Sequence, residues 1–460
     1  MTLTMTTLRS KRWLPKQFYK HCFPCIQRSF CRWINTDEST NGKSNNDSTE
    51  IASATIQVTP TMKADSYQEH SIHQYEAHLG CQDYLEGALE RLSRRIQLED
   101  QFLLLEDERN RRRRHLVDLG SADGSNSIQT LRMAVQTLHK SINDGSGTND
   151  KVPLLTTFNE HPASNQRVLE TTLSRNREWF QNSNVRYDIL MKSFYEPLFD
   201  KESVDLLLCY ICLHWLDTND TENPVSEWKQ WWPLNNNQQA TLSDFVFMNE
   251  ATVPGELVQK WREALAKKHL AKFLALRSRE LRPGAEAILM MVGQPNQYVC
   301  PSRNSVSALT LAMQNCVDKG TLRKTILEKT LIPYYVRTVE DLKEAFVMAA
   351  EMEVPLQGNA AGDDETTSTQ DERFPGALLK LVDAKTYTVN VGQGSIDGTF
   401  EMFWSIHRGS VLGAGATKTE LESVRKETKT MFRMLYDPQD GVNVTYLACL
   451  IRRRTRRAWS

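Results

Sequence analysis

The chain has 460 residues, which is enough for one large domain with insertions or for two smaller domains. Hydrophobic residues make up 40% of it and charged residues 25%, which excludes a wholly disordered, collagen-like or coiled-coil protein. The formal net charge is −1, from 56 Lys and Arg against 57 Asp and Glu, so the chain as a whole is not built to coat a nucleic acid.

The near-zero net charge hides a basic N-terminal segment. Residues 1–35 contain seven Lys or Arg and no acid, which leaves −8 (−1 minus +7) on residues 36–460. Such a segment resembles a mitochondrial or plastid presequence, and a disordered basic tail is the alternative. We predict a disordered basic leader and linker over 1–57 and a folded body over 58–460. We expect a cytoplasmic or organellar protein that is not secreted.

The cysteines do not form a metal-binding pattern. Cys22-x-x-Cys25 lies in the basic leader and Cys209-x-x-Cys212 lies in an apolar run, where buried free thiols are common. No second Cys or His pair stands at ligand distance from either, so we expect no metal and a reducing compartment. No stretch approaches 18 apolar residues, so we expect no membrane span.

Short apolar runs alternate with helical stretches from Leu103 onward, which is typical of βαβ units and a mainly parallel sheet. Strands are predicted at 115–120, 152–158 and 203–213, the last nearly all apolar, as in a strand covered on both faces. A helix is predicted at 131–142.

The second half continues this pattern, with interruptions. A long helix is predicted at 256–281, where Arg-Pro-Gly ends it, and a strand follows at 285–292. Later strands (378–390 and 442–451) flank a helix at 420–435. Segments 217–243 and 294–375, with helical pieces at 307–316 and 339–352, are predicted to form a cap over the strand ends. The expected fold is α/β, a Rossmann-like doubly wound sheet with an inserted helical cap.

Polar residues follow two of the predicted strands, at the sheet edge where ligands bind in open α/β folds. The first set is Asp118-Leu-Gly-Ser-Ala-Asp-Gly-Ser-Asn126, a D-x-G-x-x-x-G turn rather than the G-x-G-x-x-G that holds a pyrophosphate. Because the turn lacks the pyrophosphate-binding pattern, we predict a nucleoside ligand without phosphates. The alternative is that the turn has only a structural role, since a glycine turn between a strand and a helix is common. The second is Glu160, whose carboxylate can accept from both hydroxyls of a ribose. Together with the Leu-Arg-Pro-Gly exit at 281–284, they suggest an S-adenosylmethionine (SAM)-dependent methyltransferase.

Five motifs in order resemble one family. They are Ser66-Tyr67-x-x-x-Ser71-x-x-Gln74, the 118–126 turn, Asn159-Glu-His-Pro-Ala-Ser-Asn165, Ser193-Phe-Tyr195 with Leu213-His-Trp-Leu216, and Ile332-Pro-Tyr-Tyr335 before Val339-Glu-Asp-Leu342. They resemble the SABATH family, the salicylate, benzoate, jasmonate and theobromine methyltransferases. The resemblance runs from about Ser66 to the C-terminus and implies a class I methyltransferase fold.

The resemblance implies a role for each matched position. The cofactor, SAM, would be surrounded by Ser71, Asp118, Gly120, Ser121, Asn126, Glu160, His161, Ser193 and Phe194. The methyl acceptor would be contacted by Tyr67, Gln74, Ile211, His214 and Trp215. Of these, Gln74, Trp215 and His214 are the candidate catalytic residues, with the Gln74 amide and the Trp215 indole donating hydrogen bonds to a carboxylate.

The chain also departs from the family pattern. Glu160 replaces the usual Asp, and Ile211 stands where a substrate-contacting Tyr is frequent. Tyr210 is one place away, and strand alternation predicts that it points to the opposite face. The segment that supplies metal-contacting residues in some members aligns ambiguously near 242–245, so no metal is carried over.

The expected activity is methylation of the carboxylate of a small, aromatic or aliphatic acid. A carboxylate has a pKa of about 4 and is already a nucleophile at neutral pH, so the enzyme needs alignment and a dry pocket rather than a general base. Alternatives are N-methylation of a small heterocycle and a non-catalytic SAM-binding protein.

The expected partner is a small-molecule acid, without nucleic acid or membrane, and the resemblance allows a homodimer. The basic runs 111–114 and 452–457 are predicted to be solvated faces. A protein or RNA methyltransferase that uses these runs is the minority alternative.

Overall fold

The computed structural model describes most of the chain beyond the linker, and the leader predicted over 1–57 lies outside the described residues. These residues are 72–102, 113–146, 151–218, 246–248, 253, 255–294, 303–354, 375–391, 396–436 and 442–455. The boundary at residue 58 therefore stays a prediction.

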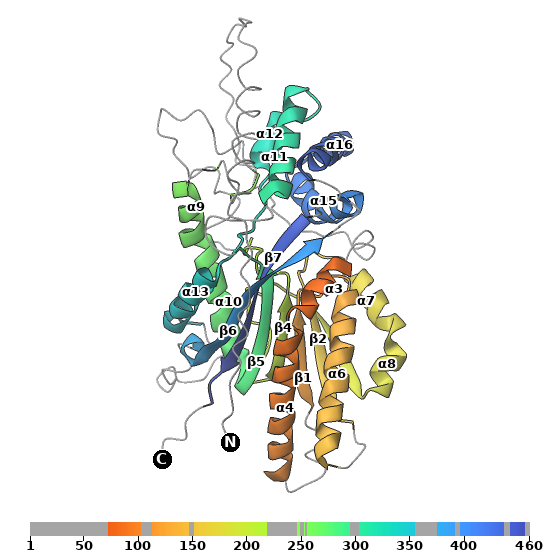
Figure 1. Cartoon of the computed structure of the whole chain (residues 1–460), viewed down its shortest axis with the longest axis vertical. Coiled ribbons are helices and arrows are strands. Elements are labelled where there is room, and N and C mark those ends of the chain that lie inside the picture. Colours follow the sequence, from red (N-terminus) through yellow and green to blue (C-terminus); the bar gives the residue numbers. More distant parts are fainter. Residues whose placement is uncertain are drawn as a thin grey trace, which may run out of the picture. The chain divides into compact units, whose positions relative to one another are not determined.

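Seven strands form one mixed sheet in the order β3-β2-β1-β4-β5-β7-β6 (Figure 1). The parallel part comprises β1 (Arg114–Leu119), β2 (Leu154–Glu160), β3 (Val185–Met191), β4 (Val204–Tyr210) and β5 (Leu281–Val292). The last strand, β7 (Val442–Arg453), runs antiparallel between β5 and β6 (Leu379–Val391). The strand order reverses between β1 and β4, which is where doubly wound sheets bind ligands. The predicted α/β sheet is confirmed.

The burial of each strand explains whether its sequence pattern predicts it. Every residue of β4 is buried, including Asp205, which accepts a hydrogen bond from Arg95 (Nη2 to Oδ1, 2.8 Å). In contrast, β3 lies at the sheet edge, and its sequence mixes Arg186, Tyr187 and Asp188 with apolar residues. This weaker pattern was not predicted as a strand, so the run expected as the third strand is the fourth.

Helices cover both faces of the sheet (Figure 1). On one face, α3 (Ile72–Leu79), α4 (Gln82–Phe102), α6 (Ser125–Ser146), α7 (Gln166–Arg175) and α8 (Arg177–Asn182) contribute to one apolar core. On the other face, α10 (Lys267–Glu280) and α13 (Val339–Glu351) contribute to a second core. Thus α13, which the sequence pattern placed in the cap, packs beside α10 against the sheet.

The long helix predicted at 256–281 contains a π-helical turn. It consists of α9 (Gly255–Trp261), the π turn η4 (Arg262–Ala266) and α10. The predicted stop at Arg-Pro-Gly is wrong, because β5 already begins at Leu281. Pro283 and Gly284 lie in β5 where its register with β4 shifts, and Gly284 has a φ of +78°. A β-bulge accepts both residues, since neither must keep ladder geometry there.

Four helices form a layer beyond the carboxyl ends of the parallel strands. They are α11 (Arg303–Asp318), α12 (Lys324–Lys329), α15 (Ile396–Gly413) and α16 (Lys418–Leu435), and they share a third apolar core (Figure 1). A short 3₁₀ turn, η6 (Pro375–Leu378), precedes β6. We name this four-helix layer the cap. It includes α15, a helix that was not predicted.

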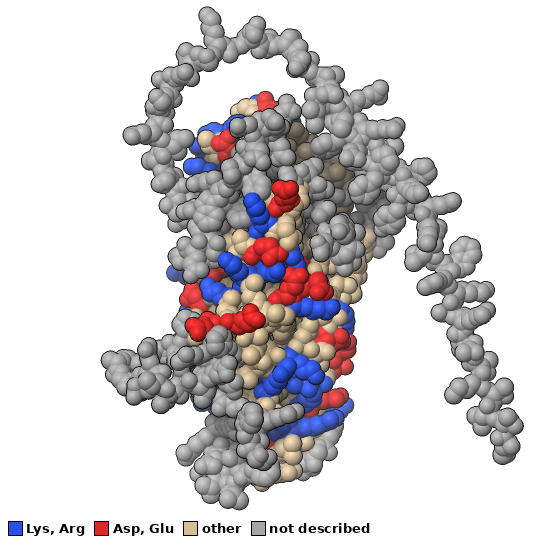
Figure 2. Space-filling view, turned by 90° about the vertical axis from the view of Figure 1, so that its left-hand side faces the viewer, with Lys and Arg blue, Asp and Glu red and all other residues tan. Residues whose placement is uncertain are grey.

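The basic runs are not simply solvated. Arg114 is buried and pairs with Glu99, and Arg453 is buried and pairs with Glu202 (2.7 Å). The prediction of solvated faces is wrong for these two residues, because both lie on strands that helices cover. On the face shown in Figure 2, acidic and basic side chains intermix without a patch of one sign. Within the described part of the chain, no helix is long and apolar enough to cross a bilayer.

The stability of the cap should depend on the hydrogen bonds at the N-terminus of α16. Thr417 and Glu420 form a capping box there, each side chain accepting from the other residue's backbone N–H. We expect Thr417→Ala to lower the free energy of unfolding by about 1 kcal/mol, because a helix N–H loses its acceptor. Urea denaturation measures this. The control is Thr430→Ala, in the exposed middle of the same helix, which should change stability by less than about 0.5 kcal/mol. Equal losses would contradict the capping explanation.

Candidate active site

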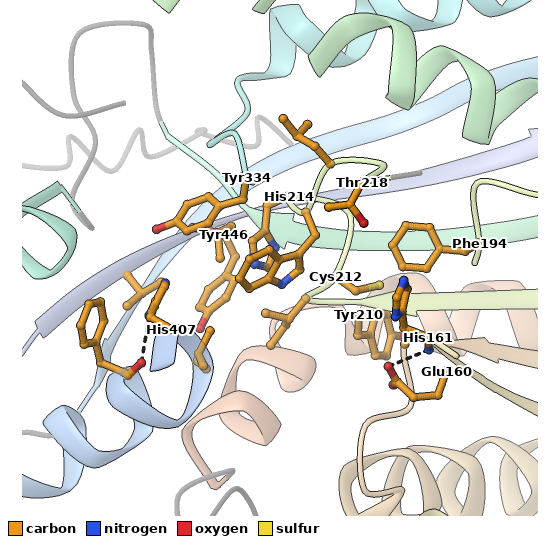
Figure 3. Close-up of a pocket in the computed structure, with 18 of the residues that line it drawn as sticks. Glu160, His161, Phe194, Tyr210, Cys212, His214, Thr218, Tyr334, His407 and Tyr446 are labelled. Atoms are coloured by element: carbon orange, nitrogen blue, oxygen red, sulfur yellow. Dashed lines mark hydrogen bonds between the residues drawn. The ribbon is translucent and has the colours of Figure 1, made fainter. Parts of the chain in front are cut away.

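A pocket lies between the carboxyl ends of the strands and the cap. Its lining comes from the ends of β1, β2 and β4, from residues 193–195 and 211–218, and from Tyr334, α15 and β7 (Figure 3). Eight of the predicted site residues line it: Gly120, Glu160, His161, Ser193, Phe194, Ile211, His214 and Trp215. They form two groups, one near Glu160 and one near Trp215.

The turn after β1 brings bare backbone to the pocket. Gly120 has a φ of +77°, and a Cβ added there would lie 2.8 Å from the Cys212 sulfur. Only glycine meets both demands without strain. The backbone N–H groups of Gly120 and Ser121 donate to the Asn159 carbonyl (2.9 and 3.0 Å), which ties the turn to the end of β2. The turn is thereby held rigid at the pocket edge.

Three predicted residues of the 118–126 turn, Asp118, Ser121 and Asn126, are not among those that line the pocket. The Ser121 hydroxyl donates to the Asp118 carboxylate (2.8 Å), and burial raises the pKa of Asp118. Asn126 lies in the first turn of α6, where its carbonyl accepts from Thr130. In this arrangement, Asp118 and Ser121 hydrogen-bond to one another and support the turn from within.

Glu160 presents a carboxylate beside the turn. One oxygen accepts from the Ala122 N–H (2.6 Å), and the other accepts from the His161 N–H (2.9 Å) and the Ser164 hydroxyl (3.0 Å) (Figure 3). Burial raises the pKa of Glu160, and these hydrogen bonds partly offset it. A carboxylate has about four acceptor positions, so these three hydrogen bonds leave about one of them to receive a hydroxyl group of a ligand at the pocket edge.

A second group of residues follows β4. Tyr210 and Ile211 both line the pocket, so the expectation that Tyr210 points away is wrong. The reason is that β4 ends at Tyr210 and Ile211 has a φ of +55°, which breaks strand alternation. A left-handed conformation is costly for a β-branched residue and persists only where the surroundings impose it.

His214 and Trp215 are held by a short strand-like contact with the segment 333–335. Trp215 and Tyr334 form an antiparallel bridge, and the Tyr335 N–H donates to the His214 carbonyl (2.8 Å). The Tyr334 ring meets the His214 and Trp215 rings edge-on, at centroid distances of 5.5 and 5.4 Å. The Tyr195 hydroxyl donates to the Trp215 carbonyl (2.6 Å). These contacts fix the orientation of both side chains.

Two neutral histidines share this end of the pocket. Burial lowers the pKa of His214 to about 3, and its Nδ1 atom is buried without a hydrogen-bond partner among the described residues. Burial also lowers the pKa of His407 to about 4. His407 Nδ1 lies 2.8 Å from the Phe403 carbonyl, so Nδ1 carries the proton and Nε2 is left as an acceptor (Figure 3). Neither ring is charged near pH 7.

Sequence reasoning missed the pocket residues that come from the cap and from β7. His407, Met402 and Phe403 lie on α15, and Tyr446 lies on β7. Their only sequence signal is the apolar character of those segments, which does not say what they face. Conversely, Tyr67 and Ser71 lie outside the described residues, and Gln74 is described only as part of α3. Their roles stay predictions.

An open sheet of this order, with a glycine turn after β1 and a carboxylate ending β2, is typical of doubly wound folds that bind a nucleoside at the point where the strand order reverses. A family model described as SAM-dependent carboxyl methyltransferase matches residues 59–357. The chain therefore belongs to this family, which confirms the predicted SABATH membership and SAM as the cofactor.

Relatives and solved structures agree with this family. Gibberellic acid methyltransferase 1 of Arabidopsis thaliana is 25% identical over 269 residues, covering 56% of this chain and 67% of the relative. Loganic acid O-methyltransferase of Catharanthus roseus is 23% identical over 303 residues, covering 63% and 72%. A structure of loganic acid methyltransferase with SAH superposes with a TM-score of 0.59 at 17% identity, covering 86% of this chain and 98% of that one. The fold is therefore that of the family.

Gly120 should be more sensitive to substitution than a glycine with open surroundings. Gly120→Ala puts a Cβ both at positive φ and against Cys212, whereas Gly320 (φ +68°) has nothing within 4 Å of an added Cβ. We expect Gly320→Ala to cost about 1 kcal/mol of stability and Gly120→Ala about 1–3 kcal/mol more. Thermal or urea unfolding measures both. Equal losses would show that the contact with Cys212 is unimportant.

Proposed function

We propose that the protein transfers the methyl group of SAM to the carboxylate of a small, largely apolar acid and releases a methyl ester. The observation that carries this proposal is the division of one pocket into two ends. One end offers a glycine turn and a carboxylate, and the other offers aromatic and apolar side chains with neutral polar groups. The matched relatives are named for methylation of gibberellic acid and loganic acid, which supports an acid as the acceptor.

The Glu160 end has the chemistry to hold the nucleoside part of SAM. Gly120 lines the pocket, so a ligand there meets a turn without a side chain. Glu160 would accept from a ribose hydroxyl with its remaining acceptor position, and Ser193, Phe194 and His161 would flank the nucleoside. Asp118, Ser121 and Asn126 would act by supporting the turn, and Ser71 stays implied by the resemblance alone. When bound, SAM supplies an electrophilic methyl group.

The Trp215 end suits an apolar acid. Among the described lining residues there is no Lys or Arg, and the acids are Glu160 and Asp217. Trp215 would donate its indole N–H to a carboxylate, with Gln74 as a second donor and His214, Ile211 and Tyr67 shaping the site. No general base is required, because a carboxylate with a pKa of about 4 is already ionised. The protein's contribution is therefore to align the oxygen and to exclude water.

A second candidate function is N-methylation of a small heterocycle. The observation that favours it is the pair of neutral histidines, His214 and His407, which could accept a hydrogen bond from a ring N–H. It predicts that neutral heterocycles, rather than acids, are methylated.

The proposal is tested with labelled SAM and matched panels of acids and heterocycles. We expect transfer to at least one aromatic or aliphatic acid, with a base-labile ester as the product, and no transfer to its primary amide. Transfer only to heterocycles would favour the second candidate. Thermal stabilisation by SAM without transfer to any compound would contradict both and indicate a binding protein.

The two ends of the pocket should be separable by mutation. We expect Glu160→Gln to raise the KM for SAM about tenfold or more, because a hydrogen bond from a hydroxyl group to a neutral amide is weaker than one to a carboxylate. Its KM for the acid should change little. Trp215→Phe should instead raise the KM for the acid and leave the KM for SAM nearly unchanged, since it removes one hydrogen-bond donor from the site that binds the acid. Steady-state kinetics with each substrate varied in turn decides this, and equal effects of both changes on both KM values would contradict the division.

A further inference from the structure

One arginine beside the pocket has no carboxylate partner. Five arginines are buried among the described residues: Arg114, Arg262, Arg277, Arg337 and Arg453. Four of them pair with a carboxylate, of Glu99, Asp341, Glu280 and Glu202 respectively. The exception is Arg337, whose exposed fraction is 0%.

Among the described residues, Arg337 donates hydrogen bonds to two carbonyl groups, and Tyr195 and Asp341 lie near enough to act on its charge. Its Nε donates to the Leu213 carbonyl (3.1 Å) and its Nη1 donates to the Ala266 carbonyl in the π turn (2.7 Å). Its Nη2 is buried and makes no well-formed hydrogen bond with the described residues. Asp341, four positions further along the chain, is already bound to Arg262 and to Thr338. Within the described residues, the charge of Arg337 is therefore not neutralised by a direct ion pair.

The positive charge of Arg337 acts on the Trp215 end of the pocket, where the methyl acceptor would bind. Leu213, which Arg337 holds, directly precedes His214 and Trp215. Arg337 is the second cause, after burial, of the lowered pKa of His214, so its charge is felt at a side chain that lines the pocket. A buried cation without a direct ion pair is expensive, because the interior solvates it poorly, and the nearby Asp341 carboxylate, already shared with Arg262, offsets only part of that cost. An anion bound at this end of the pocket would offset that cost.

We propose that Arg337 is a positioning residue whose buried charge selects an anionic methyl acceptor. It holds the backbone before His214 and Trp215 and supplies the positive potential that the lining itself lacks. The acceptor then binds as a carboxylate, and a neutral heterocycle of the same shape is disfavoured. The inference rests on the proposed function and narrows its substrate class.

The test compares acids with their primary amides, which share shape but not charge. The probes are benzoate with benzamide, cinnamate with cinnamamide and octanoate with octanamide, with SAH present and binding measured by calorimetry. We expect the wild type to bind at least one acid tenfold or more tightly than its amide. Arg337→Gln, which keeps hydrogen-bond donors but loses the charge, should reduce that ratio to about threefold or less. Arg337→Lys, which keeps the charge, should retain most of it.

A purely structural role predicts a different pattern. If Arg337 only holds the carbonyl groups, both variants weaken acid and amide alike and the ratio stays unchanged, which would overturn the inference. Trp215→Phe provides a test that does not depend on the folding of the Arg337 variants. It should keep the tenfold ratio, and loss of the ratio there would assign selection to the indole instead. A wild-type ratio below tenfold for every pair also overturns the inference. Failure of the proposed function is distinct, since it appears as no methyl transfer to any acid.

Discussion

The short contact between residues 214–216 and 333–335 joins the sheet to the segment that leads into α13. The Tyr335 N–H donates to the His214 carbonyl, and the Leu216 N–H donates to the Pro333 carbonyl (2.7 Å). Because β4 has already ended, these bonds satisfy backbone groups that the sheet no longer pairs. They also place Tyr334 against His214 and Trp215. The same contact therefore satisfies the backbone hydrogen bonds and forms one wall of the pocket.

Buried charge is handled in two ways in this molecule. Four of the five buried arginines are neutralised by a carboxylate, and two of these pairs, Arg262 with Asp341 and Arg453 with Glu202, join elements that are far apart in the sequence. Around Trp215, most polar groups of the pocket lining are instead neutral: an indole, two uncharged histidines and tyrosine hydroxyls. The exception is the Asp217 carboxylate, which pairs with Lys272. The proposed role of Arg337 follows from this contrast, because a cation without an ion-pair partner stands out only where the others are paired.

Sequence reasoning succeeded where the physical signal is local. The apolar runs of β1, β2 and β4 and the glycine turn were predicted because burial on both faces and positive φ each demand particular residue types. It failed at β3, whose edge position permits Arg186 and Asp188, and at α13, whose amphipathic pattern does not reveal which core it joins. Tyr210 was misplaced because Ile211 leaves strand geometry, a backbone event that no alternation rule includes.

The sequence by itself determined the class of fold, the glycine turn and the carboxylate at Glu160, since each depends on neighbours within a few residues. Only the tertiary structure decided that His407 and Tyr446 share a pocket with Trp215, and that Arg337 binds the Leu213 carbonyl without a direct ion pair among the described residues. The physical reason is that a helix or strand pattern specifies which face is buried but not what is buried against it. The packing of α15 and β7 against the strand ends supplies that information.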